Sequence, residues 1–63
     1  MQTETQVNEL RVYMVVQSEL RDAIRRQDKE AAMFAIEELL CIEAYSSWPR
    51  LRARCAATIA EFQ

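Results

Sequence analysis

Several residue types on which other folds depend are scarce or missing in this chain of 63 residues. Glycine is absent and proline occurs once, so the tight turns of β-hairpins, which need positive φ, have few suitable residues. Alanine, which favours helices over strands, occurs nine times. These shortages predict an all-α protein.

Histidine is also absent, and cysteine occurs only at positions 41 and 55. The common zinc-ligand sets and the histidine-based nucleophile triads are therefore excluded. Without glycine the chain has no phosphate-binding loop, and no acidic segment resembles a calcium loop. Glu37 and Glu38 are adjacent, so on a helix their side chains point about 100° apart, which is poor geometry for shared acid–base work. We expect no enzyme activity, no metal, no cofactor and no small-molecule substrate.

Residues 1–6 are polar and lack the basic start and apolar run of a secretory signal. Charged residues interrupt every apolar run well before the roughly 20 residues that span a bilayer. We therefore expect a cytoplasmic protein that does not enter the membrane, of the kind common among small bacterial and phage proteins. Cys41 and Cys55 are expected to be free thiols that act as small hydrophobic residues.

The whole chain, residues 1–63, is expected to form one domain. Apolar spacing and capping residues predict three helices, at about 5–26, 29–45 and 49–61. A turn is expected at Gln27 and Asp28, because Asp28 is a good N-cap and follows a basic segment suited to a helix C-terminus. One continuous helix from residue 5 to residue 45 is the alternative, since neither glycine nor proline enforces the stop. Pro49 suits the first turn of the third helix.

Each helix has an apolar stripe expected to face a common core. The third helix also begins beside Trp48, which we expect either to contact a partner or to close the end of the bundle. In the first two helices the stripes are Tyr13, Val16, Leu20, Ala23 and Ile24, and then Met33, Ile36, Leu40 and Ala44 with Ala32 and Leu39 beside them. In the third helix the stripe is Leu51, Cys55, Thr58, Ile59 and Phe62.

The first two helices each carry a second apolar face. In the first helix it comprises Val7, Leu10 and Met14, with Val12 and Val15 adding further apolar surface, and in the second it comprises Phe34, Cys41 and Tyr45. A monomeric bundle of this size leaves about half of each helix polar, so the surplus apolar surface predicts an interface. A homodimer is the first possibility to test. The alternative is that the alanine-rich side of the third helix, Ala53, Ala56, Ala57 and Ala60, covers both helices.

Charge is divided unevenly along the chain. Residues 1–27 are neutral, residues 28–45 have a net charge of −4 and residues 46–63 have a net charge of +2, which gives −2 overall. A partner of the Phe34 face is therefore expected to be basic at its rim. Arg50 and Arg54 share one side of the third helix, whereas Arg52 points elsewhere. Nucleic-acid binding through these three arginines is a weaker hypothesis, because a net negative chain lacks a broad basic footprint.

The sequence predicts a small non-catalytic regulator or inhibitor that binds a larger protein and covers part of its surface with a helix face. The regulator itself is expected to be a homodimer. The alternatives are a nucleic-acid-binding regulator and a structural assembly subunit. The expected protein-contact residues are Tyr13, Phe34, Glu37, Glu38, Cys41, Tyr45 and Trp48.

Overall fold

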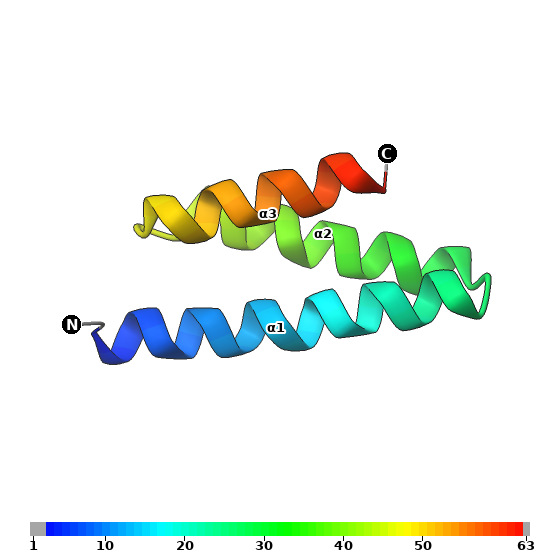
Figure 1. The fold of residues 1–63 in the computed structure, drawn as a ribbon, viewed down its shortest axis with the longest axis horizontal. Coiled ribbons are helices and arrows are strands. Elements are labelled where there is room, and N and C mark those ends of the chain that lie inside the picture. The colour runs from blue at the N-terminus through cyan, green and yellow to red at the C-terminus, as the bar shows by residue number, and fades with distance from the viewer. Residues whose placement is uncertain (1–2, 63) are drawn as a thin grey trace.

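The computed structural model describes residues 3–62, and the regular structure in that range is helical. Helices α1 (Glu4–Arg25), α2 (Lys29–Tyr45) and α3 (Pro49–Glu61) follow one another along the chain. Figure 1 shows α1 and α2 as an antiparallel hairpin, with α3 running back along α2. Helix α2 packs on both of its neighbours, whereas α1 and α3 contact each other least. The expected all-α hairpin with a third helix is confirmed.

Helix α1 begins one residue earlier than its spacing predicted. Thr3 is the N-cap: its side-chain oxygen accepts a hydrogen bond from the Gln6 backbone N–H at 3.1 Å, and Gln6 Oε1 accepts one from the Thr3 backbone N–H at 3.0 Å. This reciprocal pair is a capping box, and it satisfies two backbone donors that would otherwise lack partners. The Thr-x-x-Gln pattern in the sequence was the missed signal.

The turn between α1 and α2 lies where the sequence placed it, which excludes one continuous helix. Gln27 has φ 59°, and its backbone N–H donates to the carbonyl of Ile24 at 3.0 Å. The backbone N–H of Asp28 donates to the carbonyl of Ala23 at 2.8 Å. These two bonds define a Schellman motif, with a glutamine in the left-handed position that glycine usually occupies.

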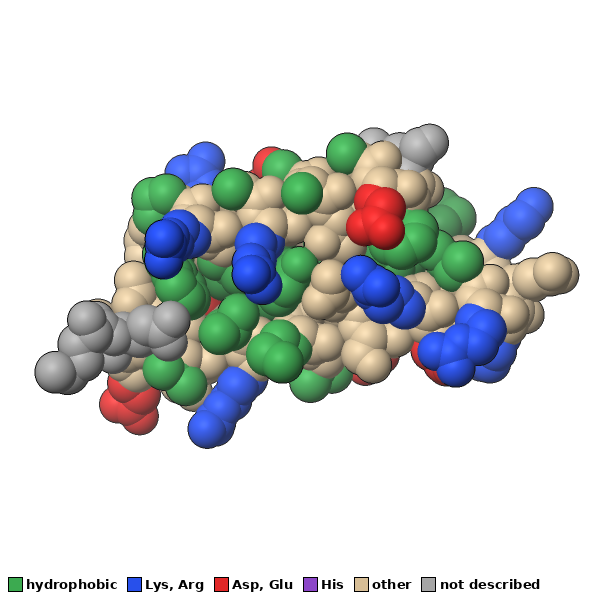
Figure 2. Space-filling model, in the orientation of Figure 1, with side chains coloured by type: hydrophobic (Ala, Val, Ile, Leu, Met, Phe, Trp, Pro, Cys, Tyr) green, Lys and Arg blue, Asp and Glu red, His purple; other side chains and the backbone are tan. Residues whose placement is uncertain are grey.

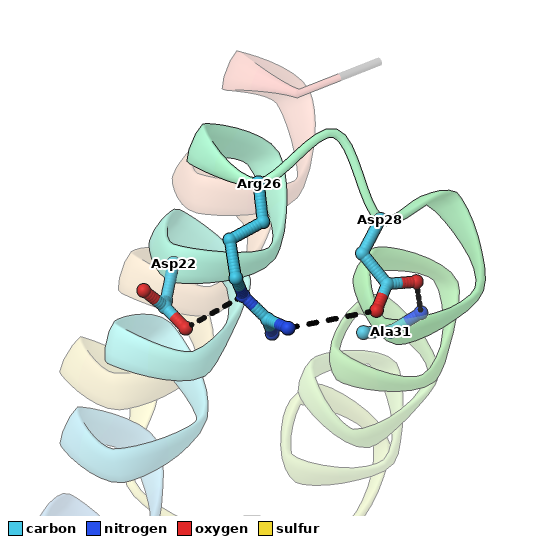
Figure 3. Close-up of polar contacts among 4 residues, drawn as sticks. All are labelled: Asp22, Arg26, Asp28 and Ala31. Carbon is cyan, nitrogen blue, oxygen red and sulfur yellow. Dashed lines mark hydrogen bonds and ion pairs between the residues drawn. The ribbon is translucent and has the colours of Figure 1, made fainter.

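Side chains reinforce both ends of this turn, as Figure 3 shows. Asp28 Oδ1 accepts a hydrogen bond from the Ala31 backbone N–H at 3.1 Å, so Asp28 is the N-cap of α2. Arg26 lies between two carboxylates, with its Nε 3.0 Å from Asp22 Oδ2 and its Nη1 3.8 Å from Asp28 Oδ2. Because these groups are about half exposed, each ion pair contributes at most about 1 kcal/mol.

The core is built from one stripe of each helix. Leu20, Leu39 and Cys55 are fully buried, one from each helix. The remaining buried members of the core cluster are Tyr13, Val16, Ala35, Leu51 and Ile59, with Leu10, Ala32, Ile36, Ile42, Trp48 and Phe62 packed partly buried against them. The stripe expected for α3 is confirmed, as is that of α1 except for Ile24, which is exposed. Helix α3 ends before it reaches the α1–α2 turn, so it does not cover the last turn of α1 (Figure 1).

The stripe expected for α2 is wrong in part. Met33, Leu40 and Ala44 are exposed, whereas Ala35 and Leu39 face the core. Twelve of the 17 residues of this helix are apolar, so the pattern does not fix which side turns inward. Ala35 has a small side chain, so it lets the neighbouring backbone approach closely.

The alanine-rich side of α3 does not cover the hairpin. Ala53, Ala56, Ala57 and Ala60 are all exposed, because α3 turns its larger apolar residues to the core instead. This alternative is therefore wrong, and apolar surface on α1 and α2 stays uncovered in the single chain. The largest exposed hydrophobic residues are Val12, Met14, Val15, Ile24, Met33, Phe34, Leu40 and Tyr45.

Candidate functional site

Four shallow concavities that share lining residues adjoin one another along the hairpin between α1 and α2, and none of their described lining residues comes from α3. The concavity at the end near Tyr45 is lined by that ring together with Val12 and Cys41. Phe34 lies further along, again beside Val12 and Cys41. We call this surface the acidic groove; the described residues that line it are Thr5, Asn8, Glu9, Arg11, Val12, Val15, Val16, Glu19, Asp22, Arg26, Ala31, Phe34, Ala35, Glu37, Glu38, Cys41, Ile42, Tyr45 and Ser46.

The floor of the acidic groove is apolar and its exposed side chains are large. Phe34 is 64% exposed and Tyr45 is 86% exposed, and Val12 and Val15 face them from α1 with more than half of their surface free. Burying the apolar area of side chains of this size removes it from water, which favours association. The groove therefore has the composition of a contact surface.

The charges along the groove are unbalanced. Its lining includes five carboxylates, Glu9, Glu19, Asp22, Glu37 and Glu38, and two guanidinium groups, Arg11 and Arg26, for a net charge of −3. Arg26 is already paired with Asp22 and Asp28. Within residues 3–62 the four glutamates of the lining form no ion pair, so the net negative charge of the groove attracts cations.

The structure brings together five of the seven expected contact residues. Phe34, Glu37, Glu38 and Cys41 line one concavity, and Tyr45 lines the next with Cys41. The sequence placed these α2 residues on one face, but it had not included Val12 and Val15 among the predicted site residues. Their signal was present, because Thr5, Asn8, Val12, Val15 and Glu19 follow each other at alternating steps of three and four residues, which place them on one side of α1.

Tyr13 is a correction to the expected contact set. It is only 3% exposed, and its hydroxyl lies 2.9 Å from the Thr58 hydroxyl oxygen in a buried hydrogen bond between α1 and α3. A residue enclosed in this way contacts no partner while the bundle stays folded. A buried tyrosine needs a polar partner for its hydroxyl, and here Thr58 is that partner.

Trp48 lies on a different surface from Phe34 and Tyr45. It is partly buried, packs against the core and precedes α3, as the bundle-end alternative expected. It also lines a groove between α1 and α3, with Leu10, Arg50, Leu51, Ala53 and Arg54, which we call the basic groove. Figure 2 shows this side of the molecule, where hydrophobic side chains gather between the two helices and basic side chains project from α3.

The three arginines of α3 divide as their spacing predicted. Arg50 and Arg54 line the basic groove, and Arg52 does not. None of the described residues that line the basic groove is acidic, so the two grooves that flank α1 have opposite charge. The molecule is therefore electrically polarised across α1.

A polar junction locks the α2–α3 connection to α1. Ser46 is buried, and its hydroxyl donates to Glu9 Oε2 at 2.8 Å while its Oγ accepts from the Trp48 backbone N–H at 3.1 Å. Sequence spacing gave no indication of this contact, because Glu9 and Ser46 are 37 residues apart. The junction holds one end of the acidic groove in a fixed shape.

The two thiols differ sharply in environment. Cys41 is exposed on the acidic groove, whereas Cys55 is buried in the core. Burial raises the pKa of the Cys55 thiol, and the nearby Glu43 carboxylate raises it further. The Cys55 thiolate is thus disfavoured, as expected for a core residue and not for a nucleophile.

Within residues 3–62, no group of three or more acidic or cysteine side chains is placed to hold a metal ion. No helix in this range is long and apolar enough to cross a membrane. Comparisons with protein-family models, curated proteins and solved structures find no match to the chain.

Proposed function

We propose that this protein is a small non-catalytic regulator or inhibitor that binds a larger protein through the acidic groove and thereby covers a functional surface of that partner. The observation that carries the proposal is the concentration of exposed Phe34, Tyr45, Val12 and Val15 on adjoining concave surfaces of net negative charge. Aromatic anchors surrounded by a charged rim are typical of protein interfaces.

We also propose that the protein acts as a homodimer, because a core of this size gains stability from a second chain. The acidic groove is unsuited to pairing with its own copy, since two surfaces of charge −3 repel each other. The exposed stripe of Met33, Leu40 and Ala44, which lies about 100° around α2 from the Phe34 face, is the better dimer surface. If this stripe bound only copies of itself and the groove bound nothing, the protein would be an assembly subunit.

The test of the partner-binding proposal uses two residues of similar exposure. Phe34 is 64% exposed on the groove, and Met14 is 58% exposed outside both the groove and the dimer stripe. We expect Phe34→Glu to lose proteins that the tagged wild-type chain captures from cell extract, while Met14→Glu keeps them. Both variants should retain the helical circular dichroism spectrum. Equal capture by wild type and Phe34→Glu would refute the assignment of the groove.

Nucleic-acid binding is a second candidate, favoured by one observation. Arg50, Arg54 and Trp48 line the same basic groove, where cations for phosphates lie beside an aromatic ring able to stack on a base. This candidate predicts a mobility shift with single-stranded nucleic acid that weakens steeply with salt and disappears in the double variant Arg50→Glu, Arg54→Glu. The Arg52→Glu variant is the control, because Arg52 is outside the groove.

A further inference from the structure

The acidic groove has the form of a helix-binding site. On α1, Thr5, Asn8, Val12, Val15 and Glu19 recur at alternating three- and four-residue steps, and on α2 so do Phe34, Glu38, Cys41 and Tyr45. Two antiparallel rows of this kind form the walls into which a further helix packs. Helix α3 already packs against the core side of the same hairpin, mainly on α2.

The length of the groove defines the size of the occupant. Its lining residues on α1 extend from Thr5 to Arg26, which is about 30 Å at 1.5 Å per residue. A helix of about 20 residues fills that length. The apolar centre at Val12, Val15 and Phe34 requires an apolar stripe on the occupant, and the carboxylates at the edges require cations on its flanks.

A second copy of this chain offers no such helix. Within the described residues α3 is its basic helix, and the apolar stripe of α3, Leu51, Cys55 and Ile59, is buried in its own core. The exposed side of α3 is rich in alanine and has no large apolar stripe. The matching occupant therefore comes from a different protein.

We propose that the acidic groove binds an amphipathic α-helix of another protein, with apolar residues at alternating three- and four-residue steps and Lys or Arg on both flanks. The proposal rests on the protein-binding function above and specifies the chemistry of the partner. The hydrophobic stripe contacts Phe34 and the valines, and the flanking cations pair with Glu19, Glu37 and Glu38. Binding also covers Cys41, so the exposed thiol reports occupancy of the groove.

The test uses three synthetic peptides of about 20 residues. The first has leucine at alternating three- and four-residue steps with lysine flanks, the second has the same composition in scrambled order, and the third has glutamate flanks. Labelling of Cys41 by a maleimide is followed by mass spectrometry, while buried Cys55 is the unreactive internal reference. We expect saturating amounts of the first peptide to slow labelling at least tenfold, and the other two peptides to have no effect.

Two variants with matched exposure locate the binding. Val15 is 57% exposed and lines the groove, whereas Met14 is 58% exposed and does not. Since both residues are exposed on α1, glutamate at either position should leave the bundle folded, which circular dichroism checks. We expect Val15→Glu to weaken binding of the lysine-flanked peptide at least tenfold in fluorescence anisotropy, Met14→Glu to leave it unchanged, and added salt to weaken it in both.

Each contrary outcome overturns a defined part of the proposal. Equal binding of the scrambled peptide would mean general charge attraction only, and binding without protection of Cys41 would place the site elsewhere. Protection of Cys41 that rises with protein concentration in the absence of peptide would make the occupant a second copy. If the lysine-flanked peptide fails while Phe34→Glu still loses captured proteins, the helix proposal is wrong and the protein-binding function stands.

Discussion

Two side-chain hydrogen bonds connect α1 to the rest of the bundle. The Tyr13 and Thr58 hydroxyls share a buried hydrogen bond of 2.9 Å, and the Ser46 hydroxyl donates to Glu9 at 2.8 Å. Because α1 and α3 have few other contacts, the Tyr13–Thr58 bond has a large share in their alignment. Removing only one partner of such a buried pair is destabilising, because the other polar group stays buried without a hydrogen bond.

We expect Tyr13→Phe to lower the free energy of unfolding by about 1–2 kcal/mol, because it leaves the Thr58 hydroxyl buried without a partner. The double variant Tyr13→Phe, Thr58→Val should lose less free energy of unfolding than the two single variants lose in sum. Urea denaturation of the four proteins measures this coupling. Tyr45→Phe is the control and should change stability by less than about 0.5 kcal/mol, because Tyr45 is exposed. Additive single effects would show that the bond contributes nothing.

Cys55 makes stability depend on pH in the alkaline range. Its pKa is raised in the folded state, mainly by burial, so the folded protein holds the thiol proton to higher pH than the unfolded chain does. The resulting stabilisation is complete below the ordinary pKa of a thiol, about 8.5, and is lost as the pH rises through the pKa of the folded state.

We therefore expect the free energy of unfolding of the wild type to fall between neutral pH and about pH 10 more steeply than that of Cys55→Ala. The variant should be less stable at neutral pH, by about 1 kcal/mol, because it leaves a small cavity. Cys41→Ala should show the wild-type dependence, since Cys41 is exposed. The same alkaline loss in wild type and Cys55→Ala would assign it to other groups.

The connection between α1 and α2 is stable without glycine, although its backbone geometry favours one. The backbone of Gln27, at φ 59°, is in the left-handed region, where a residue with a Cβ atom costs about 1 kcal/mol or more. The Schellman bonds, the Asp28 cap and the Arg26 ion pairs together offset that cost. The cap residue, not a helix breaker, is the signal in the sequence that marked this turn.

We expect Gln27→Gly to raise the free energy of unfolding by about 1 kcal/mol, because glycine enters the left-handed region without steric cost. Gln27→Ala is the matched control and should give no gain, since alanine retains the Cβ atom. Thermal or urea unfolding followed by circular dichroism measures both. A destabilised Gln27→Gly would indicate that the glutamine side chain contributes an interaction that outweighs the strain.

For the whole molecule, the main feature is the polarity across α1. The acidic groove on one side has a charge of −3, and the basic groove on the other side has two arginines and no lining carboxylate. The overall charge of −2 conceals this separation. Two surfaces of opposite charge allow one small chain to attract chemically different partners from its two sides.

We expect light scattering on a size-exclusion column to give twice the monomer mass at micromolar concentration, with the dimer formed through the Met33, Leu40 and Ala44 stripe. Met33→Glu should reduce the mass to that of a monomer, because it places a carboxylate in the apolar stripe. Phe34→Glu, at a neighbouring position of equal exposure, should leave the dimer intact. A wild-type chain that stays monomeric at millimolar concentration would refute the dimer.

The helices, their boundaries and the turn were predictable from the sequence because their causes are local. The Asp28 cap, the position of Pro49 and the apolar spacing of Leu51, Cys55 and Ile59 act within one or two turns of helix. The Phe34, Cys41 and Tyr45 face was recognisable for the same reason, since it depends on spacing within a single helix.

Two features were decided only when the helices packed: the rotation of α2 about its axis, and which residues of α1 lie beside the Phe34, Cys41 and Tyr45 face. A helix that is apolar on most sides has no preferred inward side of its own, so the close approach allowed by Ala35 selected Leu39 for the core and left Met33 and Leu40 in water. Tyr13 became a core residue because Thr58, which is 45 residues away, satisfied its hydroxyl. Spacing along one helix cannot reveal such a partner, and only the tertiary structure brings the two groups together.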